Sequence, residues 1–122
     1  MLGWWITIYQ QAPEDYDADH DKEAILASWE VSVGGIDWLE KLIAEGKAFQ
    51  LQHGGYPNIY TAVAEALLPL ISNGIPAHHG LTVIGDDYVI PGGWVGNVTI
   101  HQNKIEACPR NQKLTIVVWD LS

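Results

Sequence analysis

The chain has 122 residues, of which 48% are hydrophobic and 17% are charged, a balance that indicates a globular protein and argues against a disordered one. Fifteen acidic residues against six basic ones give a formal net charge of −9. A field of this sign repels phosphate backbones, so we expect no direct nucleic-acid binding. The acidity serves either ordinary solubility, which is the plainer explanation, or the attraction of a basic partner.

The cysteine content and the first ten residues indicate the cellular compartment in which we expect the protein. Cys108 is the only cysteine, so the chain can form no internal disulfide. The first ten residues carry no basic region and no long apolar run, which predicts neither a signal peptide nor a membrane span. We expect a cytoplasmic protein that makes no membrane contact.

The first third of the chain predicts two strands and a helix. Residues 2–10 alternate in character and indicate a first strand, and residues 14–23 are too charged to pack and indicate a loop. A second strand is predicted over residues 25–33, where every second residue is apolar. After Gly34-Gly35 the period changes to that of an amphipathic helix, which Gly46 is placed to end.

The middle of the chain predicts a hairpin and a second helix. Residues 47–53 and 56–62 flank Gly54-Gly55, a pair that suits a two-residue turn, and Pro57 then belongs at an edge or at the mouth of the hairpin. The apolar run from residue 64 to Asn73-Gly74 predicts a short buried helix. Within it, Pro69 requires either a place in the first turn or a kink.

The last third predicts strands, and the element order then indicates the fold class. Strands are expected over residues 81–84, 88–90 and 94–102, followed by a connection with at most one helical turn. The run 114–121 is apolar on both faces, which predicts a strand in the interior of its sheet. We therefore expect an α+β fold with residues 1–122 as a single globular domain. Its mainly antiparallel sheet has about six to seven strands, with two helices packed on it.

The acidic segment is the first candidate site. Its carboxylates would form a docking surface for the lysines and arginines of another protein. The residues that we assign to this partner-binding surface are Glu14, Asp15, Asp17, Asp19, Asp21 and Glu23. Aspartates at alternate positions also resemble a calcium loop, but the required glycine and final glutamate are missing.

Metal and catalytic motifs are missing from the sequence. Five histidines show none of the spacings of zinc sites, and no phosphate-binding glycine loop is present. Cys108 with His101 as its base would make a nucleophile, but nothing near Cys108 in the sequence would lower its pKa. We expect no metal and no cofactor, and we regard an enzyme as the less favoured class.

Aromatic residues and histidines suggest two alternatives to a protein-binding loop. In the first, three loops converge on a pocket for a planar small molecule, as in a ligand-binding protein or a minor enzyme. The residues that would line it are His53, Tyr56, His78, His79 and Trp94. In the second, an exposed strand edge or aromatic face forms a homo-oligomer. Six tryptophans are explained in the main by a large aromatic core, although Trp4, Trp5 or Trp94 could be exposed.

The favoured hypothesis is a small acidic protein-binding module. Its expected partner is a protein with a basic surface, and inhibition of a nuclease or a nucleic-acid-handling complex is the form that this binding would take. Small size, acidity and the lack of a catalytic set give the chain the general character of immunity and phage anti-defence proteins. That likeness is one of type and rests on no particular motif.

Overall fold

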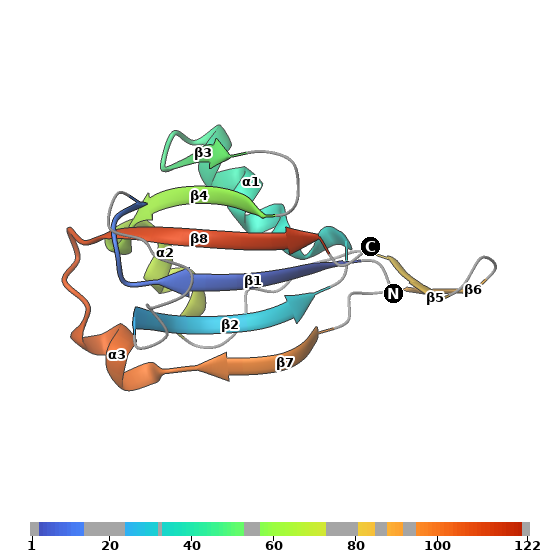
Figure 1. Ribbon diagram of the computed structural model, residues 1–122. Helices are drawn as coiled ribbons and strands as arrows, with labels where there is room; N and C mark the ends of the chain where they lie inside the picture. The colour runs from blue at the N-terminus through green and yellow to red at the C-terminus, as the bar shows by residue number, and fades with distance from the viewer. Residues whose placement is uncertain are drawn as a thin grey trace.

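The computed structural model describes residues 3–13, 24–31, 33–52, 57–72, 81–84, 88–91 and 95–120. In this part of the chain, helices cover one face of an antiparallel sheet (Figure 1). The predicted α+β class is therefore confirmed. None of the helices in these segments is both long and apolar enough to cross a membrane.

Six strands form the main sheet in the order β3-β4-β8-β1-β2-β7. Their bounds are Trp4–Tyr9 (β1), Ile25–Val31 (β2), Ala48–Gln52 (β3), Asn58–Val63 (β4), Val95–Ile100 (β7) and Lys113–Asp120 (β8). All of the pairings between neighbours are antiparallel. Two hairpins, β1-β2 and β3-β4, are each followed by a helix, and β8 lies between them.

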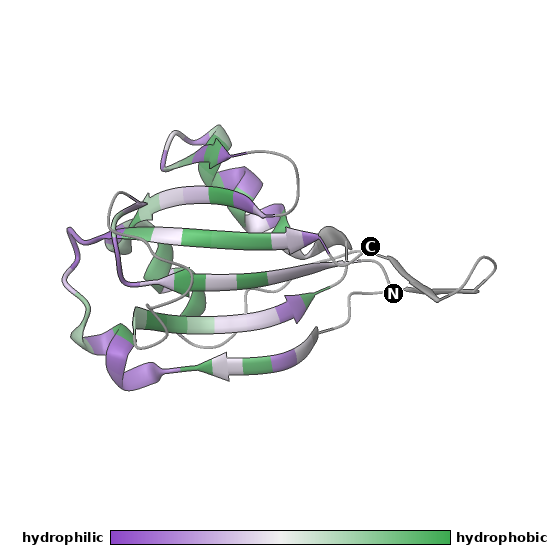
Figure 2. Cartoon of the chain, viewed as in Figure 1, coloured by the Kyte–Doolittle hydropathy of each residue, from purple (hydrophilic) through white to green (hydrophobic). Residues whose placement is uncertain are grey.

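The predicted interior strand is confirmed. Residues 114 to 118 of β8 are buried, because β4 and β1 pair with both edges of the strand. Figure 2 shows the hydrophobic colour concentrated along the middle of this strand. Because successive residues from 114 to 118 are buried, this part of the strand shows no alternation of apolar and polar residues.

The helices are α1 (Asp37–Ala44), α2 (Ala64–Ile71) and the short α3 (Gln102–Ala107). The ribbon shows α1 and α2 behind the sheet, on the same side (Figure 1). Their apolar residues join one buried cluster with the strand residues that face them. The contributing side chains include Trp38, Leu39 and Leu42 from α1, Leu67, Leu68 and Ile71 from α2, and Ile6, Ile8, Trp29, Ile116 and Val118 from the strands.

The junction between β2 and α1 is formed by two tryptophans that the sequence places in the core. The ring centroids of Trp29 and Trp38 lie 6.1 Å apart, and a 3₁₀ turn (Val33–Ile36) connects the two elements. The indole N–H of Trp38 donates to the carbonyl oxygen of Gly35 at 3.0 Å. This strand-helix unit therefore agrees with the predicted one.

Gly46 ends α1 as the sequence predicts. It has a φ of 75°, and its N–H donates to the carbonyl oxygen of Ile43 at 3.0 Å. The N–H of Lys47 donates to the carbonyl oxygen of Leu42 at 2.8 Å. Together these two bonds form a Schellman motif, which satisfies the last carbonyls of the helix and favours glycine at the left-handed position.

Two local predictions concern the middle of the chain. The predicted hairpin is confirmed by the antiparallel pairing of β3 with β4, and its turn at Gly54-Gly55 lies outside the described residues. Of the two alternatives for Pro69, a place in the first turn is excluded, because this residue lies in the second turn of α2, with its side chain exposed. The first N–H groups of α2 donate to carbonyl oxygens of the segment before β8, at 2.8 Å and 2.9 Å, which anchors the start of this helix.

A second sheet contains only β5 (Leu81–Ile84) and β6 (Tyr88–Pro91), which pair with each other. Figure 1 shows this ribbon at one end of the main sheet, beyond the ends of β1 and β8. The two strands agree with those predicted over residues 81–84 and 88–90. The main sheet therefore has six of the eight described strands, within the expected range.

Candidate protein-binding surface

All of the residues predicted to form a site lie outside the described part of the chain. This holds for the acidic set from Glu14 to Glu23 and for the alternative set of His53, Tyr56, His78, His79 and Trp94. Both assignments stay predictions. The structure does describe the residues on either side of the acidic segment, and these show where the segment leaves and rejoins the sheet.

The described residues that flank the acidic segment are joined at one end of β1 and β2. The N–H of Gln10 donates to the carbonyl oxygen of Ala24 at 2.7 Å. The hydroxyl of Thr115 donates to the carbonyl oxygen of Gln11 at 2.8 Å, so this stretch lies against β8. Pro13, the last described residue before the acids, lines a groove on the same side of the sheet.

We call the side of the main sheet that faces away from α1 and α2 the outer face. The register places Phe49, Thr61 and Thr115 in one row on this face, and Trp119, Trp5 and Glu30 in another. Thr7, Thr115 and Val117, near its centre, are buried. The large apolar residues around them are exposed: Phe49 at 59%, Leu51 at 52%, Trp5 at 42%, Val63 at 39% and Trp119 at 37%.

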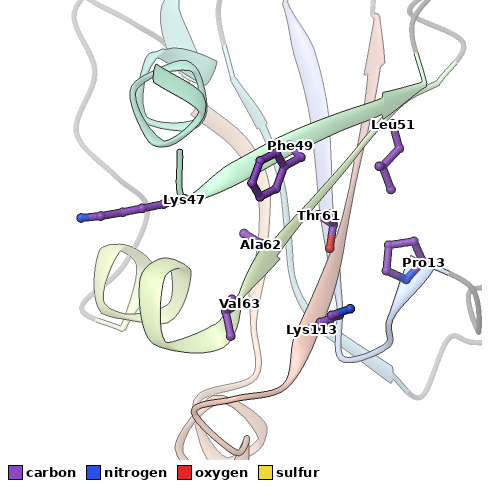
Figure 3. A pocket seen from close by; sticks show the side chains of 8 residues that line it. All are labelled: Pro13, Lys47, Phe49, Leu51, Thr61, Ala62, Val63 and Lys113. Carbon is purple, nitrogen blue, oxygen red and sulfur yellow. The ribbon is translucent and has the colours of Figure 1, made fainter. Parts of the chain in front are cut away.

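The apolar groove lies on the outer face where β3, β4 and β8 meet, and it has a volume of about 340 Å³. Its lining consists of Pro13, Lys47, Phe49, Leu51, Thr61, Ala62, Val63 and Lys113 (Figure 3). The hydroxyl of Thr61 donates to the carbonyl oxygen of Leu114 at 2.9 Å, so this donor is already hydrogen-bonded within the sheet. The groove therefore offers mainly hydrocarbon surface to a ligand.

Two lysines border the groove in different ways. The amine of Lys47 forms an ion pair with Glu45 at 3.4 Å and extends away from Phe49 in Figure 3. Lys113 and Pro13 both line the groove, and neither is near Lys47 in Figure 3. Pro13 is followed directly in the sequence by the acidic segment.

The other end of the outer face carries an aromatic pair. Trp5 and Trp119 are directly opposite each other on β1 and β8, and Glu30 is opposite Trp5 on β2. The indole N–H of Trp5 donates to the hydroxyl of Ser28 at 2.9 Å. Glu30 accepts a bond of 2.7 Å from the side-chain amide of Asn97 on β7.

Sequence reasoning missed most of this surface. Trp119 was expected inside an interior strand, but its position near the end of β8 leaves it exposed. For Phe49 and Leu51 the missing information is that β3 is an edge strand. The exposure of Trp5 was among the expectations. A local pattern could not identify the rest, because exposure depends on the order of strands in the sheet.

The titratable groups of the described residues form no catalytic set. No group of three or more His, Cys, Asp or Glu is close enough there to hold a metal ion, and of the histidines only His101 is described. Burial raises the pKa of the Cys108 thiol, which disfavours the thiolate that a nucleophile needs. Its sulfur lies 3.7 Å from the carbonyl oxygen of Pro109.

Comparisons of this chain with models of protein families, with curated proteins and with solved structures find no match.

Proposed function

We propose that this protein is a binding module for another protein, that the outer face of the sheet is the contact surface, and that the partner is basic. The observation that carries the proposal is the exposure of five large apolar side chains around one face of the main sheet. Pro13, which directly precedes the acidic segment in the sequence, lines the groove on this face. An inhibitor of a nuclease or of a nucleic-acid-handling complex is the specific form that we propose.

The apolar residues support a protein partner. An exposed side chain of this size leaves hydrocarbon in contact with water, and a cluster of such residues is typical of interaction sites. Tryptophan and other aromatic residues contribute a large share of the binding energy in many interfaces. Here Trp5, Trp119 and Phe49 are all exposed on one face, whereas Trp29 and Trp38 are buried on the other.

The two exposed clusters are close enough for one partner to cover both. Lys113 beside the groove and Trp119 are at opposite ends of β8, which corresponds to about 20 Å at the rise of a strand. An ordinary protein interface buries roughly 800 Å² on each side, enough to include both clusters. Binding at the groove and at the tryptophans would then be parts of a single contact.

The charge of the chain supports a basic partner. Eight of its fifteen acidic residues fall in the two segments Glu14–Glu23 and 85–87, and only one basic residue, Lys22, falls there. Gln11 and Pro13, which precede the first segment in the sequence, lie against the outer face. Carboxylates around an apolar contact would accelerate association with a basic protein and select against acidic ones.

The test is capture of partners from the native host with three forms of the full-length protein. One variant replaces Asp15, Asp17, Asp19 and Asp21 with asparagine, and another replaces Phe49 and Leu51 with alanine. We expect the unaltered chain to retain a basic protein at low salt and less of it at moderate salt. Both variants should lose at least about tenfold in affinity for that protein.

A matched control uses Leu70, which is exposed on α2 on the helix side of the sheet. The Leu70→Ala variant should retain the same amount of the captured protein as the unaltered chain. Retention that is equal for all forms would contradict the outer face as the contact. Self-association in analytical ultracentrifugation that the Phe49 and Leu51 variant abolishes would contradict a basic partner, because the face would then bind a second copy.

A further inference from the structure

We infer that Trp5, Trp119 and Glu30 form a binding site for the guanidinium group of an arginine on the partner. We call these three residues the indole-carboxylate row. The inference rests on the proposed function and specifies which group of the basic partner is recognised at this end of the outer face. It concerns residues that are distinct from the apolar groove and from the acidic segment.

The register of three central strands brings the row together. Trp119 pairs with Trp5, and Trp5 pairs with Glu30, so the three side chains lie at neighbouring positions on one face. Side chains directly opposite in antiparallel strands have Cβ atoms about 5 Å apart. Both indoles are exposed. A cation can therefore contact an aromatic ring and the carboxylate at the same time.

The carboxylate of Glu30 is positioned by an irregularity in the sheet. The register between β2 and β7 shifts between Ser28 and Glu30, and Asn97 adopts a φ of 48° at this bulge. Its amide then donates to one oxygen of Glu30 at 2.7 Å. A left-handed non-glycine residue is uncommon and costs free energy, and Asn97 is the only one in the described part of the chain.

The other feature of Glu30 is the kind of partner that the structure gives it. Its carboxylate accepts from a neutral amide, and the ion pair seen in the described segments joins Lys47 to Glu45. An anion that is held in place by an amide and lies beside the exposed indole of Trp5 is suited to an incoming positive charge. The net charge of −9 adds to the attraction.

A guanidinium group fits the row better than an ammonium group. It is planar, so it can stack on an indole, and its N–H groups lie in the plane, where they can reach a carboxylate beside the ring. An ammonium group is more strongly hydrated and has no flat face. We therefore expect an arginine to be preferred to a lysine at this position.

The test uses Nα-acetyl-arginine amide as the probe and the indole N–H resonances of the full-length protein as the readout. We expect saturable shifts of the Trp5 and Trp119 resonances, which are assigned from the Trp5→Phe and Trp119→Leu variants. The Glu30→Gln and Trp119→Leu variants should each bind the probe at least about fivefold more weakly. Leu70→Ala, at an exposed position of α2 on the helix side, should bind it as the unaltered protein does.

Three outcomes would overturn the inference: no saturable shift of these two resonances, unchanged binding by Glu30→Gln, or equal binding of Nα-acetyl-lysine amide. Thermal unfolding of each variant shows whether a loss reflects misfolding. Failure of this site is distinguishable from failure of the proposed function. In the first case the protein still captures a basic partner that depends on Phe49 and Leu51, and in the second it captures none.

Discussion

At the residue scale, Gly35 illustrates how closely β2 and α1 are packed. A Cβ atom at this position would overlap the side chain of Val31, which is fully buried. The carbonyl oxygen of Gly35 also accepts the indole N–H of Trp38. Neither the backbone nor the neighbouring side chain can move freely, because both belong to the core.

The Gly35→Ala variant should therefore be less stable by about 1–3 kcal/mol, the usual cost of overpacking a core. Urea unfolding followed by tryptophan fluorescence measures this difference. Gly46→Ala provides a control, because no atom lies within 4 Å of its added Cβ and its cost arises from the φ of 75° alone. Asparagine, which tolerates this φ, should restore part of the stability at Gly46 but none at Gly35.

Tyr60 gives a prediction for the effect of pH. Burial raises the pKa of its phenol, and the charge of Glu40 raises it further. Because the folded pKa lies above the unfolded value near 10, the folded state binds more protons between the two values. The stability is thus complete below about pH 10 and falls as the pH rises through the folded pKa.

The Tyr60→Phe variant should lose this decline, so its free energy of unfolding should fall less steeply than that of the unaltered protein above about pH 10. Denaturant unfolding at a series of alkaline pH values measures both slopes. Parallel slopes would show that Tyr60 titrates normally. The comparison is internal, since the other tyrosines are present in both proteins.

At the element scale, β8 holds the sheet together because it joins two hairpins that do not pair with each other. Val117 lies in the middle of this strand, is buried, and pairs with Thr7 on one side and Ile59 on the other. In the edge strand β3, by contrast, the register shift leaves Leu51 between two registered residues. The two strands should differ in their tolerance of proline.

We expect Val117→Pro to abolish cooperative unfolding, because proline removes a backbone donor and distorts a central strand. Leu51→Pro should retain a cooperative transition and lose no more than about 1–2 kcal/mol. Thermal unfolding monitored by circular dichroism distinguishes these results. If both variants fold equally well, β8 does not have the central role that its pairing indicates.

Most elements could be predicted from the sequence, whereas the order of the strands could not. Alternation of apolar residues identifies β2, and the pattern around Leu39 and Leu42 identifies α1, since both patterns arise from the local backbone period. Nothing in that period specifies that β8 lies between β4 and β1. The exposure of Phe49 follows from this order, because β3 is an edge strand, and the exposure of Trp119 follows from its place near the end of β8. For these reasons the apolar part of the surface was not predicted.

At the scale of the whole molecule, the acidic residues affect stability and binding in opposite directions. Raising the salt concentration from roughly 0.05 M to roughly 0.5 M NaCl screens the repulsion among carboxylates, so the melting temperature of the free protein should rise by a few degrees. The same change should weaken the complex with a basic partner. Thermal unfolding and a binding titration in the same buffers test both signs. A melting temperature that falls with salt would indicate that attraction within the chain outweighs repulsion.

The position of β8 in the sheet also affects how the chain folds during translation. The β1-β2 and β3-β4 hairpins leave the ribosome before β8 does, and each then has an edge of unsatisfied backbone groups where β8 will later pair. Neither hairpin can complete its pairing until residues 113–120 have been translated. A nascent chain arrested before Lys113 should therefore be sensitive to protease and prone to associate with chaperones, and a chain in which residues 113–120 have left the ribosome should lose both properties together.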